Sequence, residues 1–130
     1  MEGVEIKSIS PEETYDLRHQ VMWPDHPRDF IKLPEDIMGK HFGLFVSNNL
    51  TSVISLFISN EEAQFRKFAT DLNEQRKGYG SQLLNFLIDY TESIGIHRLW
   101  CNARVNKTHF YKKIGFKETN STYKKAELIL

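Results

Sequence analysis

The sequence predicts an α/β fold in which a mixed β-sheet carries helices on both of its faces. Several short segments alternate apolar and polar side chains with a period of two, which is typical of half-buried strands. A long segment from residue 80 to residue 94 instead repeats its apolar side chains at helical spacing. Glycine, proline and asparagine separate these segments. The expected order along the chain is therefore β-α-β-β-β-α-β-α-β-β.

The composition indicates a single domain, residues 1–130, with one hydrophobic core. Seventeen basic residues balance seventeen acidic ones, which argues against a mainly electrostatic nucleic-acid binder. The single cysteine, Cys101, excludes an internal disulfide and fits a reducing compartment. No apolar run approaches a membrane span, and the N-terminus lacks the apolar core of a signal peptide. We therefore expect a cytoplasmic protein with no membrane partner.

The first forty residues predict one strand, one helix and an irregular segment. Residues 4–9 alternate and predict the strand. Ser10 and Glu13 have the spacing of a capping box, so a helix should begin there and run to about Met22. Residues 23–40 hold three of the four prolines and predict an irregular segment, with a short helix from Pro34 to Met38.

The middle of the chain predicts three strands. Residues 41–47 and 52–59 should form a hairpin across Asn48-Asn49, because asparagine tolerates positive φ. After a turn at residues 60–62, a further strand should run from Ala63 to Thr70. Its apolar residues move from odd to even positions halfway along. A slip of one residue is what a β-bulge produces, so we predict a bulge near Arg66-Lys67.

The segment that follows this strand predicts an anion site. A polar turn, residues 71–77, leads to Gly78 and Gly80 and then into the long helix. The first amides of a helix lack intrahelical partners, and glycines let the backbone approach a phosphate. Residues 75–77 add side-chain donors and positive charge. The loop lacks a P-loop ending and a dinucleotide fingerprint, so a plain strand-to-helix turn remains the alternative.

The C-terminal half predicts the remaining elements. Gly95 should end the long helix as a left-handed cap. We then expect a strand over residues 97–103 and a short helix over residues 107–113, which a glycine ends. The last element should be a hairpin in which residues 116–118 pair with residues 123–130 across a turn of residues 119–122. The apolar face of the long helix should comprise Leu83, Leu84, Leu87, Ile88, Thr91 and Ile94.

Two motifs in this half resemble those of the GNAT superfamily of N-acetyltransferases. That family carries Gln/Arg-x-x-Gly-x-Gly/Ala after its fourth strand, and residues 75–80 read Gln-Arg-Lys-Gly-Tyr-Gly. The family also has a Phe-Tyr-x-Lys-x-Gly-Phe segment, and residues 110–116 read Phe-Tyr-Lys-Lys-Ile-Gly-Phe. The resemblance implies a mixed, mostly antiparallel sheet of about seven strands, splayed between strands 4 and 5.

The resemblance also implies an enzyme that moves the acetyl group of acetyl-CoA to a primary amine of a small molecule or a protein by direct attack, with no metal. Residues 75–80 would hold the CoA pyrophosphate, and residues 68–70 would pair with the pantetheine arm in the gap beside the bulge. The family often has glycine where this chain has Arg76, and asparagine where it has Arg104. The cofactor-binding residues that the resemblance implies are Phe68, Ala69, Thr70, Gln75, Arg76, Lys77, Gly78, Tyr79, Gly80, Ser81, Arg104, Asn106 and Phe110.

Tyr111 is the candidate general acid, since the family places a tyrosine here beside the CoA sulfur. A phenol with a pKa near 10 is protonated at neutral pH and can donate. The alternative is a tyrosine that only packs on the core. Cys101 is expected to be buried rather than a nucleophile. The general base stays open among Glu61, Glu62, Asp71, His19, His41 and a water molecule.

Other functions and the assembly state also remain open. The chain could bind acyl-CoA without turnover, as a sensor or interaction domain. A nucleotide-binding domain of another kind is disfavoured by the absence of a βαβαβ pattern. Residues 23–40 mix both signs of charge and do not name an acceptor. The protein could be a monomer or a homodimer, because residues 127–130 could either offer an apolar edge to a partner or close the core.

Overall fold

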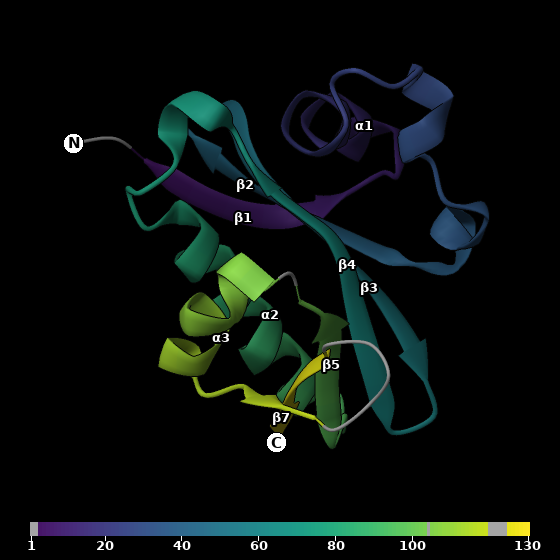
Figure 1. Ribbon diagram of the computed structural model, residues 1–130, viewed down its shortest axis with the longest axis vertical. Coiled ribbons are helices and arrows are strands. Elements are labelled where there is room, and N and C mark those ends of the chain that lie inside the picture. The colour runs from purple at the N-terminus through teal and green to yellow at the C-terminus, as the bar shows by residue number, and fades with distance from the viewer. Residues whose placement is uncertain (1–2, 104, 120–124) are drawn as a thin grey trace.

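The computed structural model describes residues 3–103, 105–119 and 125–130 (Figure 1). Within these residues, seven strands form one sheet in the spatial order β1-β2-β3-β4-β5-β7-β6. Neighbouring strands are antiparallel except β4 and β5, which are parallel. The predicted fold class and element order are confirmed. The strands are β1 (Val4–Ile9), β2 (Lys40–Val46), β3 (Asn49–Ser59), β4 (Glu62–Thr70), β5 (Arg98–Asn102), β6 (Lys117–Glu118) and β7 (Lys125–Ile129).

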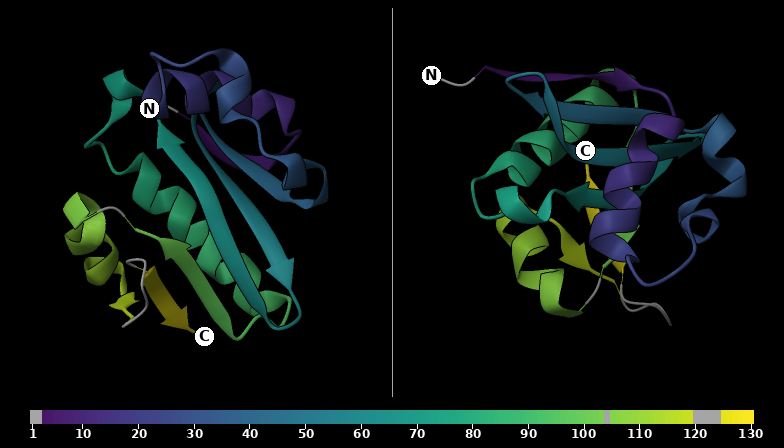
Figure 2. Two further views of the ribbon diagram at one scale, coloured as in Figure 1. Left: turned by 45° about the vertical axis from the view of Figure 1, so that its right-hand side comes forward. Right: turned by 90° about the horizontal axis from the view of Figure 1, so that it is seen from above.

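Helices cover both faces of this sheet (Figure 2). On one face α2 (Tyr79–Ser93) and α3 (Thr108–Ile114) close the larger hydrophobic core. The opposite face carries the predicted N-terminal helix, over a smaller core that joins Leu17 to Val53 and Ala69. This helix consists of three successive turns: a 3-10 helix (Glu12–Thr14), α1 (Tyr15–Leu17) and a π-helix (Arg18–Met22). No helix in the described ranges has the length and apolarity needed to cross a membrane.

The N-terminal helix begins with the predicted capping box and ends at the predicted residue. The Ser10 amide donates to Glu13 Oε1 at 2.9 Å, and the Glu13 amide donates to Ser10 Oγ at 3.3 Å. The change from 3-10 to π geometry was not predicted. Two further 3-10 helices follow, Arg28–Ile31 and Pro34–Met38, of which only the second was expected.

A buried polar network fastens the segment between the N-terminal helix and β2 to the sheet. The Arg18 guanidinium is fully buried and donates to both carboxylate oxygens of Asp36, at 2.8 and 2.9 Å. It also donates to Ser55 Oγ on β3 at 2.9 Å. His41 Nδ1 lies 2.7 Å from the same hydroxyl. His41 Nε2 lies 2.8 Å from the Asp36 carbonyl oxygen, which can only accept, so Nε2 is the donor.

The β2–β3 turn lies one residue earlier than predicted. Ser47 and Asn48 are its two central residues, with φ of 48° and 69°, and Asn49 already pairs with Val46 as the first residue of β3. Two positive φ values are typical of a type I′ turn, whose twist matches that of the flanking strands. The match between the twist of the turn and that of the strands therefore decided its position. The prediction of Asn48-Asn49 had relied only on the preference of such turns for asparagine.

β4 carries the predicted bulge. Its pairing with β3 shifts between Val53 and Ser55, so Lys67 and Phe68 lie together opposite Ile54. Lys67 has a φ of 54°, in the left-handed region. The extra residue bends the strand at this point.

The sheet opens between β4 and β5. Their parallel pairing is confined to residues 62–64 and residues 98–100. Past Gln64 the two strands diverge (Figure 2, left). In the described residues, no strand lies beside residues 65–70 of β4 on this side. The expected splay between the fourth and fifth strands is therefore confirmed.

The C-terminal elements follow the prediction with two differences. Gly95 and Gly115 end α2 and α3 at φ of 87° and 119°, as expected. Ile94 was assigned to the apolar face of α2 but is 44% exposed, because the helix ends at Ser93 before it. β7 lies between β5 and β6, and β6 pairs with it only at residues 126 and 127. The last strand is therefore an edge of the sheet over only part of its length. The predicted turn over residues 119–122 and the start of the last strand at Tyr123 fall largely outside the described residues.

Candidate active site

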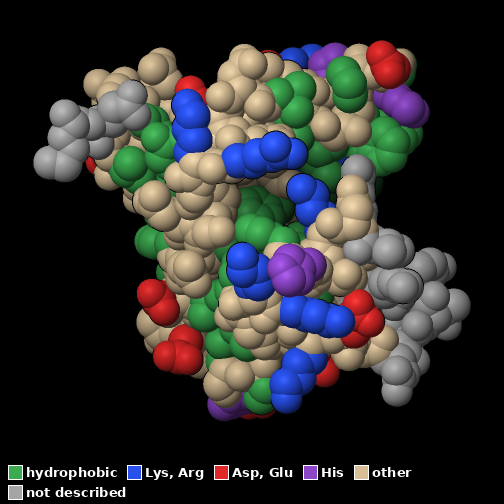
Figure 3. Space-filling model, turned by 60° about the vertical axis from the view of Figure 1, so that its left-hand side comes forward, with side chains coloured by type: hydrophobic (Ala, Val, Ile, Leu, Met, Phe, Trp, Pro, Cys, Tyr) green, Lys and Arg blue, Asp and Glu red, His purple; other side chains and the backbone are tan. Residues whose placement is uncertain are grey.

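A cleft of about 580 Å³ lies where the sheet opens. Figure 3 shows apolar side chains at the bottom of this hollow, with lysine, arginine and histidine side chains around it. β4 supplies one wall, and the loop before α2, the π-helix, the end of β5 and α3 supply the others. The lining residues are Val21, Met22, residues 65–70, Glu74, Gln75, Arg76, residues 78–81, Cys101, Asn102, Lys107, Phe110 and Tyr111.

One end of the cleft is formed by the glycine loop and the N-terminus of α2. Gly78 caps the helix at a φ of 88°. The first intrahelical hydrogen bond runs from the Gln82 amide to the Gly78 carbonyl at 3.0 Å, so the amides of residues 79–81 have no acceptor within the helix. A Cβ at Gly80 would lie 3.2 Å from Thr70 Oγ1, so glycine lets the helix approach β4 closely. This end can therefore take an anion.

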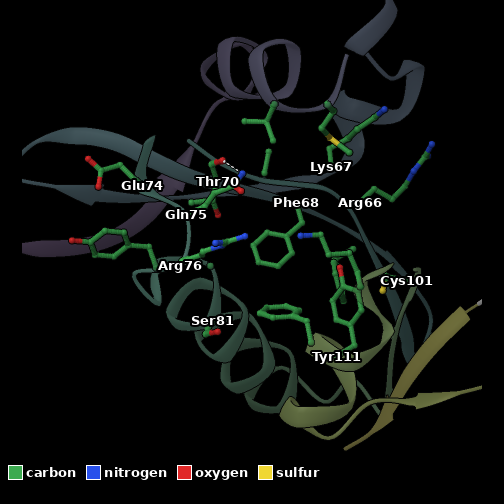
Figure 4. A pocket seen from close by; sticks show the side chains of 18 of the residues that line it. Arg66, Lys67, Phe68, Thr70, Glu74, Gln75, Arg76, Ser81, Cys101 and Tyr111 are labelled. Carbon is green, nitrogen blue, oxygen red and sulfur yellow. Dashed lines mark hydrogen bonds between the residues drawn. The ribbon is translucent and has the colours of Figure 1, made fainter. Parts of the chain in front are cut away.

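Most of the cofactor-binding residues that were predicted lie together here. Gln75 donates through Nε2 to the Thr70 carbonyl at 3.0 Å (Figure 4). Lys77 and Asn106 do not line the cleft, and Lys77 Nζ lies 2.6 Å from a Glu74 carboxylate oxygen instead. Arg104 lies outside the described residues. The predicted residues that do line the cleft are Phe68, Ala69, Thr70, Gln75, Arg76, Gly78, Tyr79, Gly80, Ser81 and Phe110.

Tyr111 lies deeper in the cleft and is 9% exposed. Its ring packs against Phe65, Phe110 and Phe116, with centroid distances of 5.9, 5.2 and 5.7 Å. Its hydroxyl is close enough to the side chain of Cys101 to lower the pKa of that thiol. The ring therefore packs on the core, as the alternative expected, and it also lines the cleft beside the open edge of β4; its role as an acid stays a prediction.

Cys101 is poorly suited to act as a nucleophile. Burial raises the pKa of its thiol to about 12, although hydrogen bonds with Tyr111 and the Ala126 amide oppose that rise. The thiolate is the reactive form of cysteine. At neutral pH the thiol therefore stays protonated, in agreement with its expected burial.

None of the candidate side chains for the general base lines the cleft. His41 belongs to the network around Arg18, and His19 Nε2 lies 2.7 Å from the His26 carbonyl oxygen. The three carboxylates also contact other groups: Glu61 lies 3.9 Å from His97 Nε2, Glu62 pairs with Arg98 at 2.9 Å, and Asp71 accepts from the Asn73 amide at 2.8 Å.

Sequence reasoning missed several residues that line the cleft. Val21 and Met22 reach it from the π-helix, for which the sequence carried no signal. Asn102 ends β5, and Lys107 precedes α3. Arg66 and Lys67 also line the cleft. Arg66 and Lys67 were predicted to form the bulge but were not predicted to belong to the site. The predicted bulge could have indicated this, because bulges are frequent next to active sites.

Comparisons with known proteins agree with this geometry. Residues 5–130 match the family model described as "Acetyltransferase (GNAT) domain". The chain is 29% identical over 129 residues to "Uncharacterized N-acetyltransferase YitI" of Bacillus subtilis (strain 168), with 92% of this chain and 87% of that protein covered.

Solved structures share the fold at low sequence identity. A putative N-acetyltransferase from Lactobacillus plantarum has a TM-score of 0.85 at 17% identity, with 99% of this chain and 98% of that chain covered. A GNAT family acetyltransferase from Elizabethkingia anophelis with acetyl-CoA bound has a TM-score of 0.81 at 18% identity, with 98% of both chains covered. The PaiA N-acetyltransferase from Thermoplasma acidophilum in complex with coenzyme A has a TM-score of 0.78 at 18% identity, with 98% and 99% covered.

Proposed function

The chain belongs to the GNAT acetyltransferase family, and on that premise we propose that it transfers the acetyl group of acetyl-CoA to a primary amine of a small molecule or a protein by direct attack. The observation that carries this proposal is the continuous cleft along the open edge of β4. It has an anion-binding loop at one end and a buried tyrosine hydroxyl farther along. The acetyl donor and the reacting group can therefore be held by different parts of one cleft.

The loop residues fit the pyrophosphate of CoA. The amides of residues 79–81 have no intrahelical acceptor and lie at the positive end of the dipole of α2. Nothing lies within 4 Å of the place where a Cβ would stand on Gly78, so the backbone is accessible there. Arg76 lines the same end of the cleft and adds positive charge.

The open edge of β4 fits the pantetheine arm. No strand of the described part of the chain lies beside residues 65–70 on this side, so their backbone groups can pair with an extended ligand as with an added strand. The Thr70 carbonyl already accepts from Gln75. Phe68 and Ala69 are therefore the residues whose main chain would hold the arm.

Tyr111 would protonate the leaving thiolate. A phenol is protonated at neutral pH and can donate its proton. The packing of its ring against Phe65, Phe110 and Phe116 orients the phenol, while the protonated thiol of Cys101 does not compete with the amine as a nucleophile. Because no candidate base side chain lines the cleft, water would carry the proton away from the amine.

A thermal melt in the presence of acetyl-CoA, CoA, ATP or NAD tests the donor. A ligand at a hundredfold excess over its Kd stabilises the folded state by about 2.7 kcal/mol. For a chain of 130 residues, that is a rise in Tm of about 10 °C. We expect the rise with acetyl-CoA and CoA only, together with CoA release when a suitable amine is added.

A matched pair of glycine substitutions tests whether acetyl-CoA binds at the glycine loop. Gly78→Asp should remove most of the Tm rise, because it adds a side chain and a like charge. Gly95→Asp is the control, since Gly95 has a similar φ of 87° and equally open surroundings at the other end of α2. The proposal is wrong if neither acetyl-CoA nor CoA raises the Tm of a cooperatively unfolding protein, or if no amine releases CoA.

Arg76 should trade stability against affinity for CoA. Its φ is 68°, in the left-handed region, which costs a non-glycine residue about 1–2 kcal/mol. This explains why the family often has glycine here. Arg76→Gly should therefore raise the free energy of unfolding by about 1 kcal/mol, while loss of the guanidinium weakens CoA binding about tenfold.

Melts without ligand and CoA titrations measure these two effects. Arg76→Gln separates them, because it removes the charge but keeps a side chain at the strained position. It should bind CoA as weakly as Arg76→Gly without the gain in Tm. A lower Tm for Arg76→Gly than for the parent protein would contradict the strain argument.

A further inference from the structure

A second hollow of about 310 Å³ continues the cleft beyond the bulge. It shares Met22, Phe65, Arg66, Lys67 and Asn102 with the first and adds Trp23 and Gln64. β4 runs through both, from Thr70 near the glycine loop to Gln64 at this end. In Figure 4, Arg66 and Lys67 lie at the opposite end of the cleft from Glu74 and Arg76. An acceptor that approaches from the end not filled by CoA would therefore enter here.

The chemistry of the second hollow is cationic. Arg66 and Lys67 are its charged lining residues, and Gln64 and Asn102 contribute amides. Among the described residues, no aspartate or glutamate lines it. The only carboxylate found along the first hollow, within the same described residues, is Glu74, which pairs with Lys77 beside the glycine loop. A ligand cation would therefore meet Arg66 and Lys67 here, with no carboxylate among the described lining residues to bind it.

The fold holds both cations at the point where the acceptor would enter. Lys67 occupies the bulge at a φ of 54°, a left-handed conformation that is unfavourable for a lysine. Backbone strain of this kind is concentrated at functional sites. Arg66 donates from one nitrogen, Nη1, to Glu35 at 2.7 Å. A guanidinium carries five N–H donors, so this ion pair fixes the side chain and leaves donors for a ligand.

We propose that the acceptor is a primary amine that also carries an anionic group, a carboxylate or a phosphate, within a few bonds of its nitrogen. Arg66 and Lys67 would bind that group. Two nearby cations also disfavour the protonated form of the incoming amine, which promotes attack where no carboxylate base is present. A polyamine would be rejected for the same reason. This inference rests on the proposed transfer from acetyl-CoA.

Matched amines test the inference through the rate of CoA release. β-Alanine is compared with β-alaninamide, and O-phosphoethanolamine with ethanolamine, so that each pair differs in the anionic group. 1,3-Diaminopropane serves as the dication. We expect at least one anionic amine to exceed its uncharged counterpart about tenfold or more in kcat/KM, with the dication poorest. The pair that shows the larger ratio distinguishes carboxylate from phosphate.

Substitutions assign the preference to the two cations. Arg66→Gln and Lys67→Gln should each bring the ratio of anionic to uncharged amine toward one by raising KM for the anionic amine. The Tm rise with acetyl-CoA should persist in both. Lys7→Gln is the control, because it removes the same charge from β1, which β2 and β3 separate from β4. It should leave the ratio unchanged.

The outcomes separate this inference from the proposed function. Preference for uncharged or dicationic amines, with the Tm rise by acetyl-CoA retained, would overturn the inference alone. A preference that survives both Arg66→Gln and Lys67→Gln would overturn the assignment to these residues. Absence of the Tm rise, or of CoA release with every amine, would overturn the proposed function, and this inference with it.

Discussion

Replacing Tyr111 with phenylalanine is expected to lower kcat about a hundredfold while leaving acetyl-CoA binding nearly intact. The substitution keeps the ring, which packs against Phe65, Phe110 and Phe116. It removes only the hydroxyl, which lies near Cys101 and would protonate the leaving thiolate. The loss should therefore appear in the chemical step and not in the binding of the donor.

Steady-state rates and ligand-dependent melts distinguish these two effects. Tyr90→Phe is a suitable control, because Tyr90 is a partly buried tyrosine of α2 that packs against Phe42 and Phe86 and does not line the cleft. The defect of Tyr111→Phe should shrink with an acyl donor whose thiol is more acidic, since such a thiolate leaves without a proton. Unchanged kcat with acetyl-CoA would remove Tyr111 from the mechanism.

Replacing Asp36 with asparagine is expected to lower the free energy of unfolding by about 3–5 kcal/mol. The carboxylate is the ion-pair partner of the fully buried Arg18 guanidinium, at 2.8 Å. Without it, Arg18 keeps an uncompensated buried charge, which is costlier than the pair itself is favourable. For a chain of 130 residues, we expect a fall in Tm of about 10–18 °C.

The pH dependence of this difference provides a second measurement. Burial raises the pKa of Asp36, but hydrogen bonds from Arg18 and the Leu33 amide and the Arg18 charge outweigh it, so the pKa lies below its usual value. A carboxyl with a lowered pKa stabilises the folded state fully above about pH 4 and loses that contribution as the pH falls through its folded-state pKa. Melts at decreasing pH should therefore show the parent protein converging on Asp36→Asn.

Two further variants test whether the effect comes from the buried charge. Asp16→Asn breaks the ion pair of Asp16 with Arg28, whose two side chains are exposed, and should change Tm little. The double variant Arg18→Met with Asp36→Leu removes both charges and should recover much of the lost stability. An Asp36→Asn protein as stable as the parent would show that water or another group satisfies Arg18.

Local patterns in the sequence predicted most of the elements of the fold. Alternation located β1 and β4 to within a residue, and the phase slip in β4 located the bulge at Lys67. Gly95 and Gly115 marked the ends of α2 and α3, because the left-handed conformation at a helix end favours glycine. These features depend on neighbours in the chain, and a single sequence contains that information.

The features that escaped prediction depend on residues far apart in the chain. Arg18 and Asp36 are separated by 18 positions, and no periodicity announces that they will pair. Asn102 and Lys107 line the cleft only because β5 diverges from β4. The same holds for the general base, because the candidates were plausible by residue type but lie elsewhere in the fold.

The open edge of β4 has a consequence for edge-to-edge pairing with strands of other chains. An exposed strand edge is a template on which other chains can add, and it promotes aggregation. Here the unpaired edge lies inside the cleft, with Val21 and Met22 on one side and Phe110 and Tyr111 on the other. The edge also carries the bulge and the charged side chain of Lys67. Bulges and charged residues are two means by which natural sheets block edge-to-edge pairing. The protein can thus keep an unpaired edge for a narrow ligand while excluding a strand of another protein.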